Sequence, residues 1–174
     1  MSFNRSEIIK KLLEAYQAFY NITDESLGCQ ELKALCEYYE QNEGYMVTRK
    51  ANLWTAKSEE FIYLFEAEHL TLELFERLFE LAYGDGRQRA HIGPGHMYTY
   101  ITPIFICDSA DAEAINALKK VSIHKMFLFS FHGWLDVHTA LITTRTDELF
   151  TNKSGRCMEK NMKKIIFNER GLSS

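Results

Sequence analysis

The hydrophobic residues of this 174-residue chain change their spacing several times, from a helical period to the alternation of a strand and back. Apolar residues at i, i+3 and i+4 predict amphipathic helices, whereas strict alternation predicts half-buried strands. The spacing predicts helices over residues 4–20, 70–83, 108–118 and 154–167. It predicts strands over residues 31–41, 45–54, 61–68, 97–107, 124–131, 137–144 and 149–152. Strands linked by short turns favour antiparallel pairing, so we expect an α+β fold with a mainly antiparallel five- to seven-stranded sheet and helices packed on one face.

Local signals mark the ends of these elements. Asn4 followed by Glu7 predicts a capping box at the first helix. Thr71 is expected to cap the second helix and Gly84 to end it. Residues 31–41 fit either a helix or a strand, and we favour the strand because it completes a three-stranded meander with the next two predicted strands.

The composition restricts the class of protein. With 46% hydrophobic and 25% charged residues, no linker and no low-complexity segment, we expect one globular domain over residues 1–174. The N-terminal residues lack a signal-peptide pattern, and no apolar run reaches the roughly 20 residues that span a bilayer. The four cysteines form neither a C-x-x-C pair nor a disulfide framework, which suits reduced thiols. We therefore expect a cytoplasmic protein that has no membrane partner.

The charge balance argues against nucleic acid as a partner. The net charge is −4, whereas binding to phosphate backbones depends on Lys and Arg. Basic residues gather in residues 153–164 at helical spacing, which is typical of a solvated helix face. No motif indicates a cofactor, and the oligomeric state stays open.

Several short clusters carry a resemblance to a known family. They are Lys50-Ala51-Asn52-Leu53-Trp54, His96-Met97-Tyr98-Thr99-Tyr100, Phe129-Ser130-Phe131-His132-Gly133-Trp134-Leu135-Asp136, and Thr151-Asn152 followed by Gly155-Arg156. Together they resemble an uncharacterised family of small bacterial proteins, a domain of unknown function, over most of the chain. The resemblance implies a bacterial cytoplasmic protein. It carries no assigned activity, so it transfers no catalytic residue.

Glycine and basic residues gather in the loop predicted after the second helix. They are Arg87, Arg89, His91, Gly93, Gly95 and His96. Backbone N–H groups exposed by glycines, beside guanidinium and imidazole groups, are suited to binding an anion such as phosphate. However, a P-loop runs from a strand through glycines into a helix, whereas this segment runs from a helix into a strand. That order favours the alternative, a polar connecting loop.

A second candidate site follows from the register of a predicted hairpin. A three-residue loop at 133–135 sets the apolar residues of 124–131 against those of 137–144 better than a two-residue loop does. It would also bring four polar side chains to one face: Ser130, His132, Asp136 and His138. These are the residue types of a nucleophile, a base and its orienting group. His132, Asp136 and His138 are equally the types of a metal site, and a solvated sheet face carries the same groups.

Two functional hypotheses result. The leading one is a non-enzymatic binding or protein-interaction module that holds an unknown small molecule or protein partner on the sheet face or in an aromatic groove. The aromatic residues of the first meander are Tyr38, Tyr39, Tyr45, Trp54 and Tyr63. The alternative is a metal-assisted hydrolase-type enzyme built on the hairpin residues, with help from His96.

Overall fold

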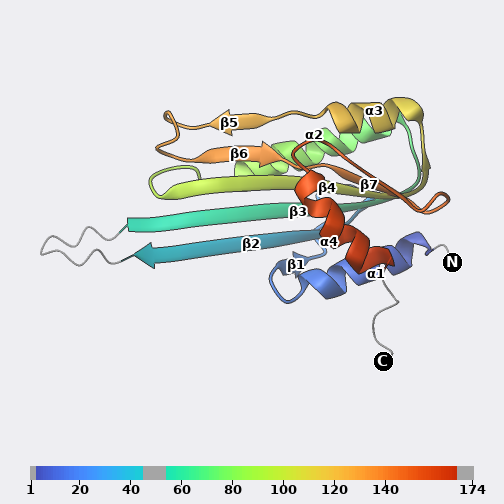
Figure 1. Ribbon diagram of the computed structural model, residues 1–174, viewed down its shortest axis with the longest axis horizontal. Helices are drawn as coiled ribbons and strands as arrows, with labels where there is room; N and C mark the ends of the chain where they lie inside the picture. The colour runs from blue at the N-terminus through green and yellow to red at the C-terminus, as the bar shows by residue number, and fades with distance from the viewer. Residues whose placement is uncertain (1–2, 45–53, 168–174) are drawn as a thin grey trace, which may run out of the picture.

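The computed structural model describes residues 3–44 and 54–167 and has an eight-stranded sheet at its centre (Figure 1). The strands are β1 (Asn21–Thr23), β2 (Leu32–Gly44), β3 (Trp54–Leu70), β4 (His96–Ala110), β5 (His124–Met126), β6 (Trp134–Val137), β7 (Ala140–Thr143) and β8 (Glu148–Thr151). The helices are α1 (Arg5–Tyr16), α2 (Leu72–Arg89), α3 (Ala112–Lys120) and α4 (Arg156–Phe167). None of the described helices combines the length and the apolar character needed to cross a bilayer.

The sheet is mixed, which corrects the expected strand pairing. Its order is β1-β2-β3-β4-β6-β5, and β7 continues beside β4 and pairs with β8. The pairs β3–β4, β4–β6 and β4–β7 are parallel, and the others are antiparallel. The α+β class is confirmed, but the mainly antiparallel sheet of five to seven strands is wrong. The physical reason is that α2 returns the chain across the sheet between β3 and β4, and a crossover of this kind makes the two strands parallel.

Helices cover both faces of the sheet rather than the one face that the sequence predicted. Alternate residues of β3 show this directly, because Phe61, Tyr63 and Phe65 pack with α2 and α3. Ile62 and Leu64, on the opposite face, pack with α1 and α4. A continuous apolar run of this kind is the pattern of a strand that is buried on both sides.

The two predicted helix caps are confirmed, whereas several other predicted helix ends are wrong. The first helix ends at Tyr16 rather than at residue 20, and the third begins at Ala112 because residues 108–110 extend β4. Asn4 and Glu7 form the capping box, and Thr71 accepts a hydrogen bond from the backbone N–H of Leu74. The second helix does not end at Gly84 but continues to Arg89. Gly86 lies on its buried face, where a Cβ atom would come within 2.8 Å of the Ile101 side chain. Glycine therefore serves close packing of helix on sheet here, not a turn.

The predicted three-stranded meander is wrong, because β3 runs without a break from Trp54 to Leu70 and forms a two-stranded hairpin with β2. Residues 32–41 of the ambiguous segment belong to β2, so the strand interpretation is confirmed, and β2 pairs antiparallel with β3. Of the predicted strand over 45–54, only the last residue lies in the described chain, as the start of β3. At the other end of the chain, β8 pairs back on β7 as predicted.

The hairpin predicted around residues 133–135 is wrong. β5 pairs with β6 in a register that sets His124 opposite Asp136 and Met126 opposite Trp134. Residues 127–133 form the turn, and Phe129 and Phe131 are 93% and 80% exposed in it. The alternation of apolar residues predicted that these phenylalanines would pack on one face of a strand, but both side chains face solvent.

Candidate functional site

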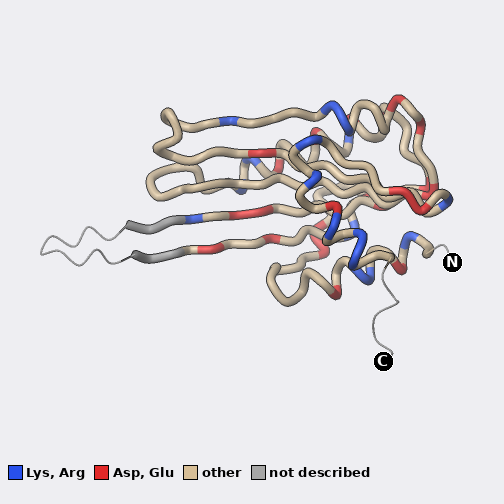
Figure 2. Tube along the Cα trace, in the orientation of Figure 1, with Lys and Arg blue, Asp and Glu red and all other residues tan. Residues whose placement is uncertain are grey.

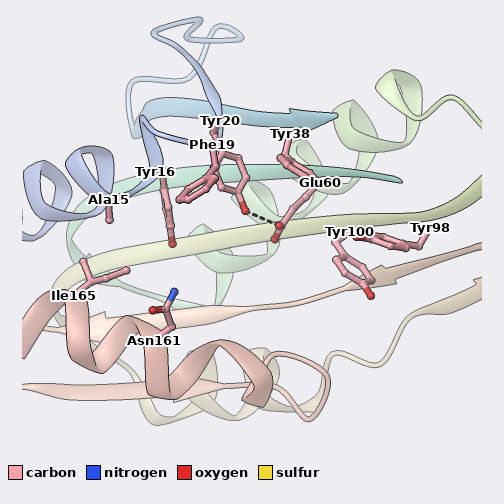
Figure 3. Close-up of a pocket in the computed structure, with 10 residues that line it drawn as sticks. All are labelled: Ala15, Tyr16, Phe19, Tyr20, Tyr38, Glu60, Tyr98, Tyr100, Asn161 and Ile165. Atoms are coloured by element: carbon pink, nitrogen blue, oxygen red, sulfur yellow. Dashed lines mark hydrogen bonds between the residues drawn. The ribbon is translucent and has the colours of Figure 1, made fainter. Parts of the chain in front are cut away.

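A pocket of about 440 Å³ opens where the sheet extends beyond the cover of α1 and α4 (Figure 3). Its walls come from α1 and the turn after it, from the strands β2, β3 and β4, and from α4. Six of its ten lining residues are aromatic and one is charged. The lining residues are Ala15, Tyr16, Phe19, Tyr20, Tyr38, Glu60, Tyr98, Tyr100, Asn161 and Ile165.

The floor of the pocket is built by strand register. Tyr38 of β2 lies opposite Glu60 of β3, and Glu60 lies opposite Tyr100 of β4. Directly opposed residues in a sheet point to the same face, so these three side chains stand in one row. Glu60 has the same parity along β3 as Ile62 and Leu64, which pack under α1 and α4. The row therefore begins where the apolar core of this face ends.

Glu60 is a partly buried carboxylate held by two hydroxyl groups. Tyr20 Oη donates to Glu60 Oε2 at 2.7 Å, and Thr102 Oγ1 donates to Glu60 Oε1 at 3.0 Å. Burial raises the pKa of Glu60, and the two hydrogen bonds counter only part of that effect. Among the described residues, no ion pair reaches this carboxylate.

Tyr16 and Tyr20, beside Glu60, stay protonated at neutral pH. Burial, and then the charge of Glu60, raise the pKa values of Tyr16 and Tyr20. The same two causes raise the pKa of Cys36, two residues before Tyr38 on the same face of β2, to about 12. Because the phenols keep their protons, they act as hydrogen-bond donors toward the carboxylate or toward a ligand.

The rings form two contacting groups on either side of Glu60. Tyr20 lies 5.2 Å from Tyr16 and 5.7 Å from Tyr38 between ring centroids. Across the pocket, Tyr98 stacks on Tyr100 at 4.4 Å. The second group continues into the sheet, where Trp134 stacks on Tyr98 and His138 contacts Tyr100. Ring faces and edges thus surround a single acidic group.

The structure does not assemble the four residues predicted at the hairpin. Asp136 Oδ1 lies 2.5 Å from Nδ1 of His124. His138 is buried against Tyr100, and burial lowers its pKa. Ser130 donates to the sulfur of Met126 in the turn. The backbone oxygen of His132 accepts a hydrogen bond from His96 Nδ1.

These placements remove the geometric basis on which the hairpin residues were chosen. Among the described residues, no group of three or more His, Cys, Asp or Glu side chains could hold a metal ion. A catalytic role for the hairpin residues stays a prediction that now lacks the expected arrangement.

The residues predicted to bind an anion are spread over α2, the following connection and β4. The guanidinium group of Arg89 contacts three carboxylates: Asp85 at 2.6 Å, Glu25 at 2.8 Å and Glu37 at 3.0 Å. Arg87 lies over the ring of Tyr83.

The two histidines of the predicted anion site also form contacts within the protein. His91 Nδ1 contacts Glu59 at 2.9 Å. His96 is buried between Thr99 and the backbone of the β5–β6 turn. Gly93 and Gly95 lie in the connection between α2 and β4. Anion binding stays a prediction, and carboxylates already pair with two of the side chains that would carry it, Arg89 and His91.

Sequence reasoning found part of the pocket and missed its centre. Of the aromatic residues singled out, Tyr38 lines the pocket, whereas Tyr39 is exposed on the opposite face and Tyr63 is buried and donates to Asp85. Tyr45 lies outside the described residues. Glu60 was missed, although an acidic residue at the same parity as buried apolar positions of its strand is a usable signal.

Comparison with known proteins identifies a family but no function. The profile of a domain of unknown function, DUF8052, matches residues 4–164. This match confirms the resemblance to an uncharacterised family over most of the chain. No curated protein and no solved structure matches the sequence.

Proposed function

Because the chain belongs to the DUF8052 family, to which no activity is assigned, we propose a function from the site itself: the protein binds a small organic ligand in the aromatic pocket. The single observation that carries the proposal is the partly buried Glu60 carboxylate at the floor of an aromatic cavity. This is the binding-module hypothesis in a more definite form. We also propose a cytoplasmic setting, which the four free cysteines support, in a bacterium, which the resemblance of the sequence implies.

The dimensions and lining of the pocket suit a small molecule. Small-molecule sites are mostly apolar, with a few polar groups that fix orientation, and measure roughly 300–1,000 Å³. A volume of about 440 Å³ lies within that range. Six aromatic side chains supply the apolar surface, and Glu60 supplies the polar anchor.

Two further polar groups face the pocket and are open to a ligand. The hydroxyl of Tyr16 and the side-chain amide of Asn161 point into it from α1 and α4 (Figure 3). Neither has a hydrogen bond to any residue in the described part of the chain. A ligand that bridges them would complete their hydrogen bonding.

The metal-assisted hydrolase remains a weaker second hypothesis. No observation among the described residues favours it, because Asp136 pairs with His124 and His138 packs on Tyr100.

A fragment screen with a blocked pocket tests the proposal. Asn161 is exposed on α4 and lines the pocket, so Asn161→Trp should fill the cavity without loss of folding. Arg156→Trp adds the same side chain to the same helix away from the pocket and is the matched control. We expect ligand-observed NMR to find fragments that bind wild type and Arg156→Trp but not Asn161→Trp. Fragments that bind all three proteins equally, or a screen without hits, would contradict the proposal.

A further inference from the structure

We infer that the ligand of this pocket carries a positively charged nitrogen, which lies against the Glu60 carboxylate and the surrounding tyrosine rings. The inference rests on the proposed function and extends it by naming the ligand's chemical class, a small organic ammonium compound.

Glu60 differs from three other partly buried carboxylates, Glu31, Glu37 and Glu66, each of which pairs with Lys or Arg. Carboxylates recur along β2 and β3 (Figure 2). Among the partly buried ones, Glu31 pairs with Arg77 at 2.6 Å. Glu37 pairs with Arg89 at 3.0 Å. These pairs follow the rule that a desolvated charge is offset by an opposite charge.

A third carboxylate gives the closest comparison. Glu66 lies on the same face of the same strand as Glu60, six residues further along, and pairs with Arg5 at 3.4 Å and Lys33 at 3.9 Å. Glu60 receives only two neutral hydroxyl groups, from Tyr20 and Thr102. A carboxylate has about four acceptor positions, so capacity remains for a cationic donor. Within the described residues, the protein supplies that donor for Glu66 and not for Glu60.

Tyrosine rings lie on both sides of Glu60, where they would also contact a bound cation. The face of an aromatic ring attracts a cation within about 6 Å of its centroid, and the attraction is strongest where water is excluded. Tyr38 and Tyr100 lie in direct register on either side of Glu60. Tyr20 and Tyr98 each contact one of them. A cation placed at the carboxylate would therefore also meet tyrosine rings from both sides.

The remaining lining of the pocket indicates what the rest of the ligand is like. Beyond Glu60, the pocket is lined by Ala15, Phe19 and Ile165, which suit an apolar body. An anionic ligand would meet Glu60 as a like charge, with no Lys, Arg or His among the lining residues to offset it. The pocket thus selects for an ammonium group joined to an apolar or aromatic body.

Three matched probes test the charge requirement: 2-phenylethylamine, 2-phenylethanol and phenylacetate, which carry a positive, a neutral and a negative group on similar bodies. Their dissociation constants are measured by titration calorimetry or NMR near pH 7. We expect the amine to bind wild type at least about tenfold more tightly than the alcohol, and phenylacetate to bind most weakly. This comparison uses the unaltered protein, so it does not depend on the folding of a variant.

Two substitutions test whether the preference for the amine depends on Glu60. In Glu60→Gln, the amine and the alcohol should bind within about threefold of each other, whereas Glu66→Gln should keep the wild-type preference. Equal binding of amine and alcohol to wild type, or an amine preference that survives in Glu60→Gln, would overturn the inference. Neutral fragments that bind the pocket in preference to amines would also overturn it and leave the proposed function standing. Only the absence of any pocket ligand in the fragment screen would remove the proposed function itself.

Discussion

Tyr20 and Glu60 are 40 residues apart in the sequence, and the hydroxyl of Tyr20 donates a 2.7 Å hydrogen bond to the carboxylate of Glu60. This bond ties the turn after α1 to the middle of β3. It closes one wall of the aromatic pocket and holds the carboxylate in place on its floor. The same contact therefore contributes to both the fold and the site.

Removal of this hydroxyl should destabilise the protein. Tyr20→Phe leaves one oxygen of a partly buried carboxylate without its donor, which costs about 1–3 kcal/mol of unfolding free energy. Urea denaturation measures the loss. Tyr16→Phe is the control, since the Tyr16 hydroxyl has no hydrogen-bond partner among the described residues, and it should change stability by less than about 0.5 kcal/mol. Equal losses in the two variants would contradict the role given to the Tyr20–Glu60 bond.

Glu60 should make the unliganded protein less stable as pH rises. Burial raises its pKa in the folded state above the ordinary value of 4.5. A group of this kind contributes stability that is fully present below its unfolded pKa and is lost as pH rises through its folded pKa. Glu60→Gln does not titrate there. Its unfolding free energy relative to wild type should therefore increase as pH rises above 4.5, in urea titrations at several pH values. A difference that does not vary with pH would count against a raised pKa.

His138 should have the opposite pH dependence. Burial against the Tyr100 ring lowers its pKa below the ordinary value of 6.5, so the folded state favours neutral imidazole. The stability that this group contributes is present above pH 6.5 and is lost as pH falls through its folded pKa. We expect NMR titration to place the pKa of His138 below 6.5. We also expect wild type to lose more stability than His138→Gln as pH falls from 6.5. A pKa at or above 6.5 would contradict this account.

Substitution by alanine should have opposite effects on stability at the two glycines of α2. At Gly84 an added Cβ atom would have no other atom within 4 Å, so Gly84→Ala should stabilise the helix by about 0.5–1 kcal/mol. At Gly86 the added carbon would come within 2.8 Å of buried Ile101, and Gly86→Ala should cost about 1–3 kcal/mol despite the better helix propensity of alanine. Thermal or urea unfolding compares the two. Stabilisation by both substitutions would show that α2 does not pack on β4 as closely as described.

Sequence reasoning succeeded where the signal is local. The capping box joins Asn4 to a residue three positions away, and the Thr71 cap joins it to Leu74, so short patterns suffice to predict both. The Gly84 prediction failed because α2 continues through this glycine to Arg89 instead of ending there. Gly86, on the buried face, lies against a residue of a later strand, which no local pattern reveals.

Non-local register explains the larger errors. The predicted hairpin maximised apolar matches, whereas in the structure Leu128, Phe129 and Ser130 adopt φ values of 46°, 50° and 71° and take the chain through a wide turn. Residues other than glycine seldom adopt positive φ, so no residue type at positions 128–130 indicated a turn there. The pocket could not be predicted from the sequence for the same reason, because its floor depends on the register of three strands around Glu60. Its aromatic residues were visible in the sequence, but their arrangement around one carboxylate was not.

The most direct test of the central claim follows the Glu60 carboxylate itself. In protein labelled with ¹³C at glutamate side chains, the carboxyl shift of Glu60, assigned with Glu60→Gln, is titrated with pH alone and with saturating 2-phenylethylamine. A cation beside the carboxylate favours its ionised form, so the amine should lower the pKa of Glu60 from its raised value in the free protein. If the pKa of Glu60 is the same with and without the amine bound, the carboxylate is not the anchor of the ligand.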